Sequence, residues 1–294
     1  MKKVFDFLLT ILLILSLSFT LLCCANTEIK NDRTSETAGE LSEPQTKTTT
    51  APVTAVTTSG GAPDIPGGDH SVLGGVMGKA EHLDYKEGDE VALSVSLLLP
   101  YAEIPDNEAV QQKVSQKLDA INSEIRNRVD LISRNYVNDL KNGIKHLSVP
   151  SLSVNFTLCY FTEKAMSIAI NMTEINASGD TYRSSEYFNF ELDSYGADIT
   201  FDTLFSDRLS DHRESVIGLV RDKAAGIGNL YPEYLSIIEE SAPSNWFVSG
   251  ESIFFRFDPY TLAPGKFGFV TFELKFTDIS PYLSDYGRDL LDLK

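Results

Sequence analysis

The chain has 294 residues, a formal net charge of −17 and 42% hydrophobic residues. Such an acidic chain repels phosphate backbones and anionic headgroups, so the composition argues against nucleic-acid binding and against electrostatic adhesion to membranes. The charge would suit a basic partner, although a need for solubility also explains it.

Residues 1–23 have the pattern of an export signal. Lys2 and Lys3 precede an apolar run from Phe7 to Leu22, and this order of charge and apolar residues is typical of a signal peptide. The run ends in Leu-Leu-Cys-Cys, which resembles the lipobox of bacterial lipoproteins. We therefore predict cleavage before Cys24 and lipidation of Cys24. An uncleaved apolar anchor is the alternative, because the run is nearly long enough to span a bilayer.

Both interpretations place the folded part on the extracellular side of the cell membrane, in a Gram-positive-type envelope. Residues 24–78 are rich in Thr, Pro and Gly without apolar periodicity, which predicts a disordered tether. With Cys23 removed and Cys24 acylated, Cys159 is the cysteine left in the exported domain. We therefore expect no internal disulfide, and a domain held together by its core.

Residues 79–150 are predicted to form an N-terminal strand–helix subdomain. Apolar residues alternate from Val91 to Leu99, which indicates a strand. Asp106 or Asn107 then provides a helix cap, and Gly143 a stop. Between them, apolar residues recur every three or four positions, as on one face of a long helix: Val110, Val114, Leu118, Ile121, Ile125, Val129, Ile132, Tyr136 and Leu140.

Residues 151–294 are predicted to form a C-terminal subdomain of strands and shorter helices. Alternating patterns at 152–158, 166–172, 188–192, 253–257 and 270–276 indicate strands with one packed face. Helices are expected at 211–225 and from Pro232 onward. The predicted fold class is α+β, with antiparallel sheet and a long amphipathic helix and one or two shorter helices packed on one side.

The sequence contains no recognisable catalytic or metal motif. No His has a second His or Cys at ligand spacing, and no G-x-S-x-G motif is present. We predict a protein that is not an enzyme, with no catalytic residues, no metal and no cofactor. A carboxylate site formed by Asp258, Glu251 and Glu273 is the alternative for a hydrolase.

The segment from Asp258 to Gly268 connects two predicted strands and carries two prolines and two glycines. Ala263 to Lys266 fits a type II turn, in which Gly265 would adopt a positive φ. The segment either packs against the core or forms a rigid edge that contacts a partner. The candidate partner-binding residues are Tyr260, Leu262, Pro264, Lys266 and Phe267.

The stretch from Phe257 to Gly268, with Ile279-Ser-Pro-Tyr-Leu283 after it and Ile199-Thr-Phe-Asp-Thr-Leu-Phe205 before it, resembles a known family. It is similar to the RsiV-like extracytoplasmic domain of anti-sigma-V factors and of the N-terminal region of peptidoglycan deacetylase C. The resemblance implies a binding module on the cell-surface side. In anti-sigma-V factors this module recognises lysozyme.

The leading hypothesis is therefore a lipid-anchored cell-surface module that binds a lysozyme-like basic protein or a peptidoglycan ligand. One alternative is a cell-wall hydrolase or deacetylase that uses the carboxylates named above. A second alternative is an envelope scaffold protein without a ligand of its own. The sequence leaves the oligomeric state open.

Overall fold

The computed structural model describes residues 75–293 apart from 105–106, 193–195 and 208–210. The predicted signal peptide, Cys24 and the tether up to residue 74 lie outside the described residues. The predicted end of the tether at residue 78 falls inside strand β1 (Val76–Glu87). No helix in the described part of the chain has the length and hydrophobicity needed to cross a membrane.

The first sheet has five strands in the order β1-β2-β3-β4-β5. Neighbours pair antiparallel except β2 and β3, which run parallel where Ser94–Leu97 meets Ser151–Val154. The sheet continues across residue 150, where we placed a subdomain boundary. The strands after β1 are β2 (Glu90–Ala102), β3 (Ser151–Phe161), β4 (Ala165–Ile175) and β5 (Thr181–Glu191).

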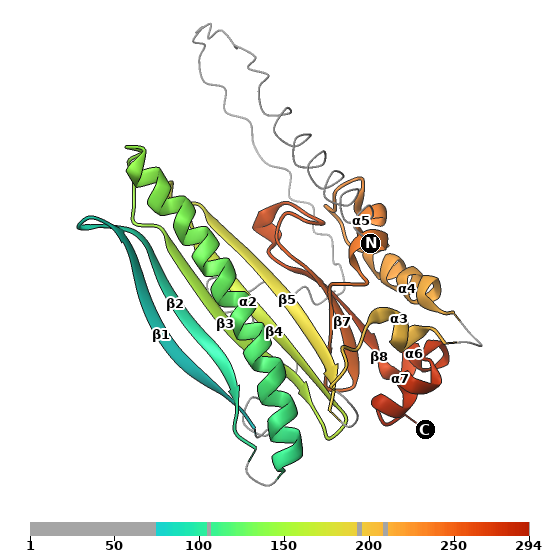
Figure 1. Ribbon diagram of the computed structural model, residues 1–294. Helices are drawn as coiled ribbons and strands as arrows, with labels where there is room; N and C mark the ends of the chain where they lie inside the picture. Colours follow the sequence, from blue (N-terminus) through green and yellow to red (C-terminus); the bar gives the residue numbers. More distant parts are fainter. Residues whose placement is uncertain (1–74, 105–106, 193–195, 208–210, 294) are drawn as a thin grey trace, which may run out of the picture. The chain divides into compact units, whose positions relative to one another are not determined.

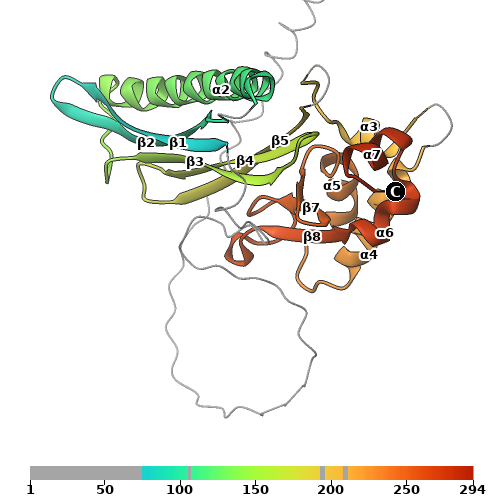
Figure 2. The same cartoon turned by 90° about the horizontal axis from the view of Figure 1, so that it is seen from below.

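Helix α2 (Glu108–Lys141) connects β2 to β3 and lies along one face of this sheet (Figures 1 and 2). A parallel pair needs a long crossover connection, and the 34-residue helix supplies it. The side chain of Asn107 caps the helix by accepting from the Val110 N–H at 3.1 Å. Gly143 follows the helix end with a φ of 75°. Both predicted ends of the helix are thus confirmed.

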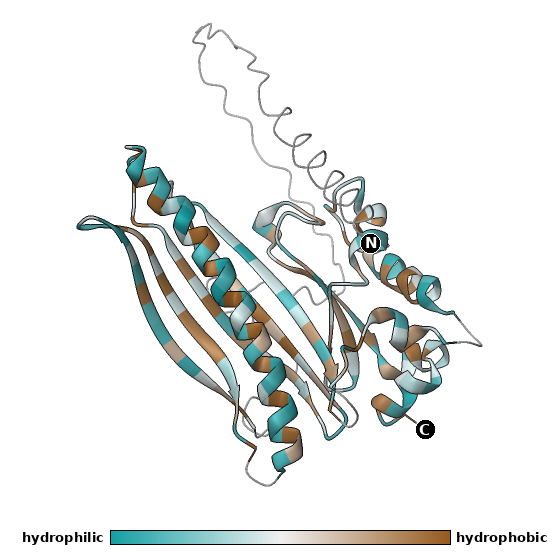
Figure 3. Ribbon diagram, viewed as in Figure 1, coloured by the Kyte–Doolittle hydropathy of each residue, from teal (hydrophilic) through white to brown (hydrophobic). Residues whose placement is uncertain are grey.

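The core between α2 and the sheet follows the alternation along the strands, which Figure 3 shows as brown and teal bands. Every second residue of β2 and β3 faces the helix, and the helix presents its apolar stripe to them. The buried residues of this core include Leu93, Val95, Leu97, Val114, Leu118, Ile121, Leu152, Val154, Met166, Ile168 and Phe190.

The second sheet is antiparallel, with β7 (Ser252–Phe257) between β6 (Trp246–Ser249) and β8 (Val270–Lys275). One face of this sheet packs with short helices around a second core that includes Phe205, Val216, Phe255, Phe257 and Phe272. The helices are α3 (Phe201–Phe205), α4 (Arg213–Ala225), α5 (Tyr234–Ser241), α6 (Phe276–Ile279) and α7 (Asp285–Leu290), with 3-10 turns η1 (Gly265–Phe267) and η2 (Ser280–Tyr282).

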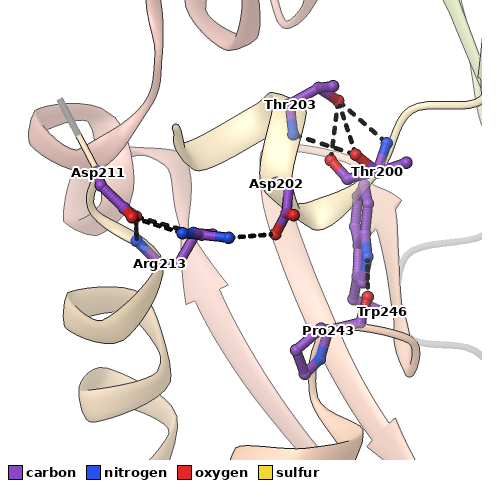
Figure 4. A network of polar contacts seen from close by, with 7 residues as sticks. All are labelled: Thr200, Asp202, Thr203, Asp211, Arg213, Pro243 and Trp246. Carbon is purple, nitrogen blue, oxygen red and sulfur yellow. Dashed lines mark hydrogen bonds and ion pairs between the residues drawn. The ribbon is translucent and has the colours of Figure 1, made fainter. Parts of the chain in front are cut away.

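Polar contacts lie at the starts of α3 and α4 and before β6 (Figure 4). Thr200 and Thr203 form a reciprocal capping box at the N-terminus of α3. Arg213, the first residue of α4, pairs with Asp211 and with Asp202 of α3. The indole N–H of Trp246 donates to the Pro243 carbonyl at 3.1 Å, which fixes the entry into β6.

The other face of the three-stranded sheet meets the face of the five-stranded sheet that points away from α2. Cys159, Ala169, Phe247 and Phe254 form a small apolar cluster there. Burial raises the pKa of the Cys159 thiol to about 12, as for a packed and unreactive cysteine.

The α+β fold class is confirmed, with three differences in detail. The five-stranded sheet is mixed, because β2 and β3 are parallel. Strands β1 and β6 were not predicted, and Phe276, predicted to end the last strand, begins α6 instead. The charged residues spread along β1 hide its period, as is common for an edge strand.

Candidate binding surface

The segment predicted to carry the binding residues, which we call the 258–268 loop, leaves β7 at Phe257 and enters β8 at Val270. Asp258 begins it, and its carboxylate accepts a hydrogen bond from the Ser185 N–H at 2.9 Å. Ser185 lies on β5, the edge strand, so Asp258 pairs an edge N–H that the sheet leaves open. The loop is therefore attached to the five-stranded sheet at its first residue.

Tyr260 is the most exposed aromatic residue of this loop. Its side chain is 64% exposed, and its backbone adopts a φ of 69°, which is unusual for a residue other than glycine. The ring lies over Gly265, where an added Cβ would come within 2.1 Å of the Tyr260 Cζ. The Tyr260 ring thus packs against the backbone at Gly265, and any larger residue at position 265 would displace it.

The predicted type II turn is wrong. Gly265 does not adopt a positive φ; Gly268 does, with a φ of 68°, and residues 265–267 form a 3-10 turn. Glycine is needed at position 265 because the Tyr260 ring approaches its backbone closely. It is not needed there for a positive φ.

The candidate residues divide into an anchor and an exposed edge. Leu262 is fully buried and Ala263 nearly so, and the Leu262 carbonyl accepts from the Tyr231 N–H at 2.8 Å. Leu262 therefore cannot contact a partner, which corrects the prediction for this residue. Pro264 is half-buried, whereas Lys266 and Phe267 are exposed and the Lys266 Nζ lies 5.1 Å from the Phe267 ring centroid.

Asp258 has an altered acidity. Burial raises the pKa of its carboxyl to about 6 from 3.8, while the hydrogen bond from Ser185 and the charge of Arg256 oppose this rise. The other two carboxylates of the hydrolase alternative lie elsewhere: Glu273 accepts from the Ser252 hydroxyl at 2.7 Å, and Glu251 lies in the turn between β6 and β7.

A network of polar side chains, in which Asn171 and Ser185 are buried, lies on part of the face of the five-stranded sheet that points away from α2. The Asn171 amide donates to Asn155 at 3.1 Å and to Thr157 at 3.2 Å, and the Ser185 hydroxyl donates to Asn171 at 2.9 Å. Beside this network lies an open depression of about 460 Å³, whose polar lining residues are Glu81, His82, Ser96, Ser153 and Asn155.

His82 lies between a hydroxyl and a carboxylate at the edge of this depression. Its Nδ1 is 3.3 Å from the Ser96 hydroxyl and its Nε2 is 3.4 Å from Asp84. The Ser94 hydroxyl also donates to Asp84, at 2.9 Å. The antiparallel pairing of β1 with β2 places His82 opposite Ser96 and Asp84 opposite Ser94, so register alone creates this group.

No family model matches the sequence, and no curated protein matches it. Solved structures do match the fold. A DUF3298-family protein from Bacteroides fragilis NCTC 9343 superimposes with a TM-score of 0.52 and 13% identity over 74% of this chain and 96% of that one. The chain therefore shares its fold with a DUF3298 protein. A DUF3298 protein from Pseudomonas aeruginosa PAO1 has a TM-score of 0.47 and 9% identity over 71% of this chain and 94% of that one.

The fold shared with the DUF3298 protein assigns no activity, because one fold carries many functions. Within it, sequence reasoning missed one residue of interest, Arg256. It is 5% exposed and belongs to β7, in which every residue is buried. The signal in the sequence was a single arginine within the apolar stretch Ile-Phe-Phe-Arg-Phe. Such a position predicts a buried arginine, and charged residues are seldom fully buried without a partner.

Proposed function

We propose that this protein is a lipid-anchored binding module outside the cell membrane, and that it recognises a basic protein of the lysozyme type or a wall polymer. The contact surface in this proposal is the exposed part of the 258–268 loop: Tyr260, Lys266 and Phe267. The observation that carries the proposal is Tyr260, an exposed aromatic held in an uncommon backbone conformation with its ring over Gly265.

Two physical arguments favour a binding role for such a residue. A strained backbone away from the core costs about 1–3 kcal/mol and persists where the surroundings or a function maintain it. A ring that is already ordered loses little conformational entropy when a partner covers it, which raises affinity. The net charge of −17 would add attraction for a basic partner.

Kinship with RsiV-like domains is part of this proposal. Its support is the motif from Phe257 to Gly268 together with the fold shared with a DUF3298 protein. The same motif contains both the buried anchor Leu262 and the exposed Tyr260, so its Pro-Tyr-x-Leu-Ala-Pro spacing would serve packing and contact at once.

The direct test measures binding of the full chain, in detergent, to hen-type lysozyme and to purified peptidoglycan at low and high salt. We expect saturable binding to one of them, weakened about tenfold or more by Tyr260→Ala and by Lys266→Ala, as for residues at the centre of an interface. Tyr182→Ala is the matched control, because Tyr182 is also about half exposed, at 52%, but its side chain lies on the α2 side of β5, near Tyr136.

Equal binding by Tyr260→Ala and the unaltered chain would reject the loop as the contact surface. Binding to neither ligand by a folded chain would favour the scaffold alternative instead. Steep weakening by salt would indicate that the acidic surface contributes, because exposed charges are screened over about 10 Å at 0.1 M salt.

The lipid anchor has a separate test. Replacing Cys24 with Ala should abolish incorporation of a fatty-acid label and release the chain from the membrane fraction if Cys24 is acylated. Retention in the membrane without label would favour an uncleaved apolar anchor.

A serine hydrolase is the second candidate function, favoured by the position of His82 between Ser96 and Asp84. In this reading His82 takes the proton of the Ser96 hydroxyl, and Asp84 orients the imidazole. A fluorophosphonate probe would test it: the Ser96 oxygen attacks phosphorus, fluoride leaves, and the proton passes to His82. Labelling that disappears in Ser96→Ala and in His82→Ala but survives in Ser94→Ala would support it; an unlabelled protein would exclude it.

A further inference from the structure

Arg256 occupies an unusual position between the two sheets. The alternate residues Ile253, Phe255 and Phe257 belong to the core shared with the short helices. Arg256 therefore points the opposite way, toward the five-stranded sheet, as does its neighbour Phe254. The side chain is 5% exposed, and the guanidinium carbon lies 4.0 Å from the centre of the Phe269 ring.

Two of the three guanidinium nitrogens of Arg256 lack acceptors. Neither its Nε nor its Nη1 has a hydrogen-bond partner, although both atoms are buried. The Phe269 ring covers one face of the group, but a ring face does not replace an in-plane acceptor for each N–H. Arginine also remains charged in proteins, so the group cannot escape the cost of burial by losing a proton.

A second unpaired group lies nearby. The Tyr187 hydroxyl is buried and lies close to the Ser185 hydroxyl, but Ser185 donates to Asn171 instead, so Tyr187 is left without a hydrogen-bond partner. Its ring stacks on Phe247 with centroids 5.0 Å apart. Arg256 is close enough to Tyr187 to interact with it electrostatically. Cys159 and Asp258 are within the same range of Arg256. Asp258 does not neutralise Arg256 directly, since its carboxylate accepts from the Ser185 N–H and forms no ion pair with a described cation.

Buried polar groups are nearly always hydrogen-bonded, and a buried charge without a counter-charge is costly. Here the side chains of Arg256, which is cationic, and Tyr187 both have donors that lack acceptors in the same region. A water molecule could accept a hydrogen bond but would leave the positive charge uncompensated. A small anion supplies both the acceptor oxygens and the charge, and carboxylate and phosphate oxygens suit guanidinium donors.

We propose that Arg256 and the Tyr187 hydroxyl form an internal binding site for a small oxyanion, of the carboxylate or phosphate type. The anion accepts hydrogen bonds from Arg256 and Tyr187 and lies between β5 and β7, so it stabilises the junction of the two sheets. This site is independent of the exposed edge of the 258–268 loop and of the proposed partner.

The test follows unfolding of the full chain in detergent by the fluorescence of Trp246, while chloride is replaced by acetate or by phosphate at constant ionic strength. A ligand that binds the native state alone raises stability with the logarithm of its concentration above its Kd. We expect a saturable rise of the unfolding midpoint with at least one of the two anions. Arg256→Gln should abolish the rise, and Tyr187→Phe should weaken apparent affinity about tenfold, as for one lost hydrogen bond.

Arg221→Gln is the matched control. The Arg221 Nε is also buried without a partner, but the other two nitrogens pair with Glu214 and Glu239. Its charge is therefore compensated, and the variant should lose stability but keep the full response to anions.

If Arg256→Gln fails to fold, Tyr187→Phe and Arg256→Lys still decide the question, because each keeps most of the packing and alters the donors. An unchanged anion response in both would overturn the proposal. So would the absence of any saturable response in the unaltered chain, which would mean that water alone satisfies these donors.

Discussion

At the scale of single residues, the position of the Tyr260 ring in the 258–268 loop depends on the absence of a side chain at Gly265. Tyr260 adopts its position because Gly265 has no Cβ, and Gly268 supplies the positive φ that the turn needs. These two glycines have different physical roles although they are three positions apart. The sequence pattern predicted a positive φ at Gly265, because composition does not distinguish a glycine needed for its backbone angle from one needed for close approach.

Substituting alanine at each glycine separates these roles. Gly265→Ala should displace the exposed Tyr260 ring into solvent, so we expect a stability change below about 1 kcal/mol but a marked shift of the Tyr260 ring resonances in NMR. Gly268→Ala should cost about 1–3 kcal/mol, since its φ of 68° and ψ of −146° suit glycine alone. The opposite ranking of the two variants in chemical denaturation would contradict this assignment.

The raised pKa of Asp258 leads to a prediction about how the stability of the fold depends on pH. Because burial raises its pKa to about 6 in the folded chain from 3.8, the folded state binds the proton more tightly than the unfolded state. The stability from this group is therefore complete below about pH 4 and is lost as pH rises through 6.

Asp258→Asn removes that titration and keeps an oxygen that can accept from Ser185. Relative to the unaltered chain, the variant should gain about 1–2 kcal/mol of unfolding free energy between pH 4 and 7, after allowing for partial solvent screening. Urea titrations at both pH values measure this difference. Parallel pH profiles for the two proteins would show that Asp258 titrates normally.

At the scale of elements, α2 was predictable because its apolar stripe, cap and stop signal all lie within one continuous segment. The strand alternation in β2–β5 was predictable for the same reason. The pairing of β2 with β3 was not, since a parallel pair depends on two segments separated by the whole helix. β1 was missed because as an edge strand it buries little and carries charge along its length.

The N-cap of α2 offers a test at this scale. Asn107→Ala removes the acceptor for the Val110 N–H and should cost about 1 kcal/mol of unfolding free energy. Asn107→Ser should recover most of the loss, because serine is also a good cap. Equal losses in both variants, measured by urea denaturation, would indicate that packing at position 107 matters more than capping.

At the scale of the whole folded part, two cores meet across polar links. The Asn189 amide donates to the Trp246 carbonyl at 3.0 Å, and the Val248 N–H donates to the Ser167 hydroxyl at 3.1 Å. Ser167 also donates to Asn189. These residues join β4 and β5 to β6, so hydrogen bonds and the small cluster around Phe247 together connect the sheets.

Asn189→Ala should therefore cost about 1–3 kcal/mol, because it leaves the Trp246 carbonyl buried without its donor. Since the chain has 1 tryptophan, the emission of the folded variant should also change. Asn171→Ala is the control: its hydrogen bonds stay within the five-stranded sheet, so it should lower stability without altering the emission. Identical emission from both folded variants would mean that Asn189 does not position Trp246.

The sequence by itself determined the features that depend on neighbouring residues: the periods of α2 and most strands, the helix cap and stop, the α+β class and a loop between the last two strands at 258–268. Tertiary structure alone decided which residues of that loop are exposed, that β2 and β3 run parallel, and that two buried nitrogens of Arg256 lack acceptors. The physical reason is the sequence separation over which each interaction acts. Periodicity and capping act within a few residues, whereas burial and unpaired donors depend on segments such as β5 and β7 that meet only after folding.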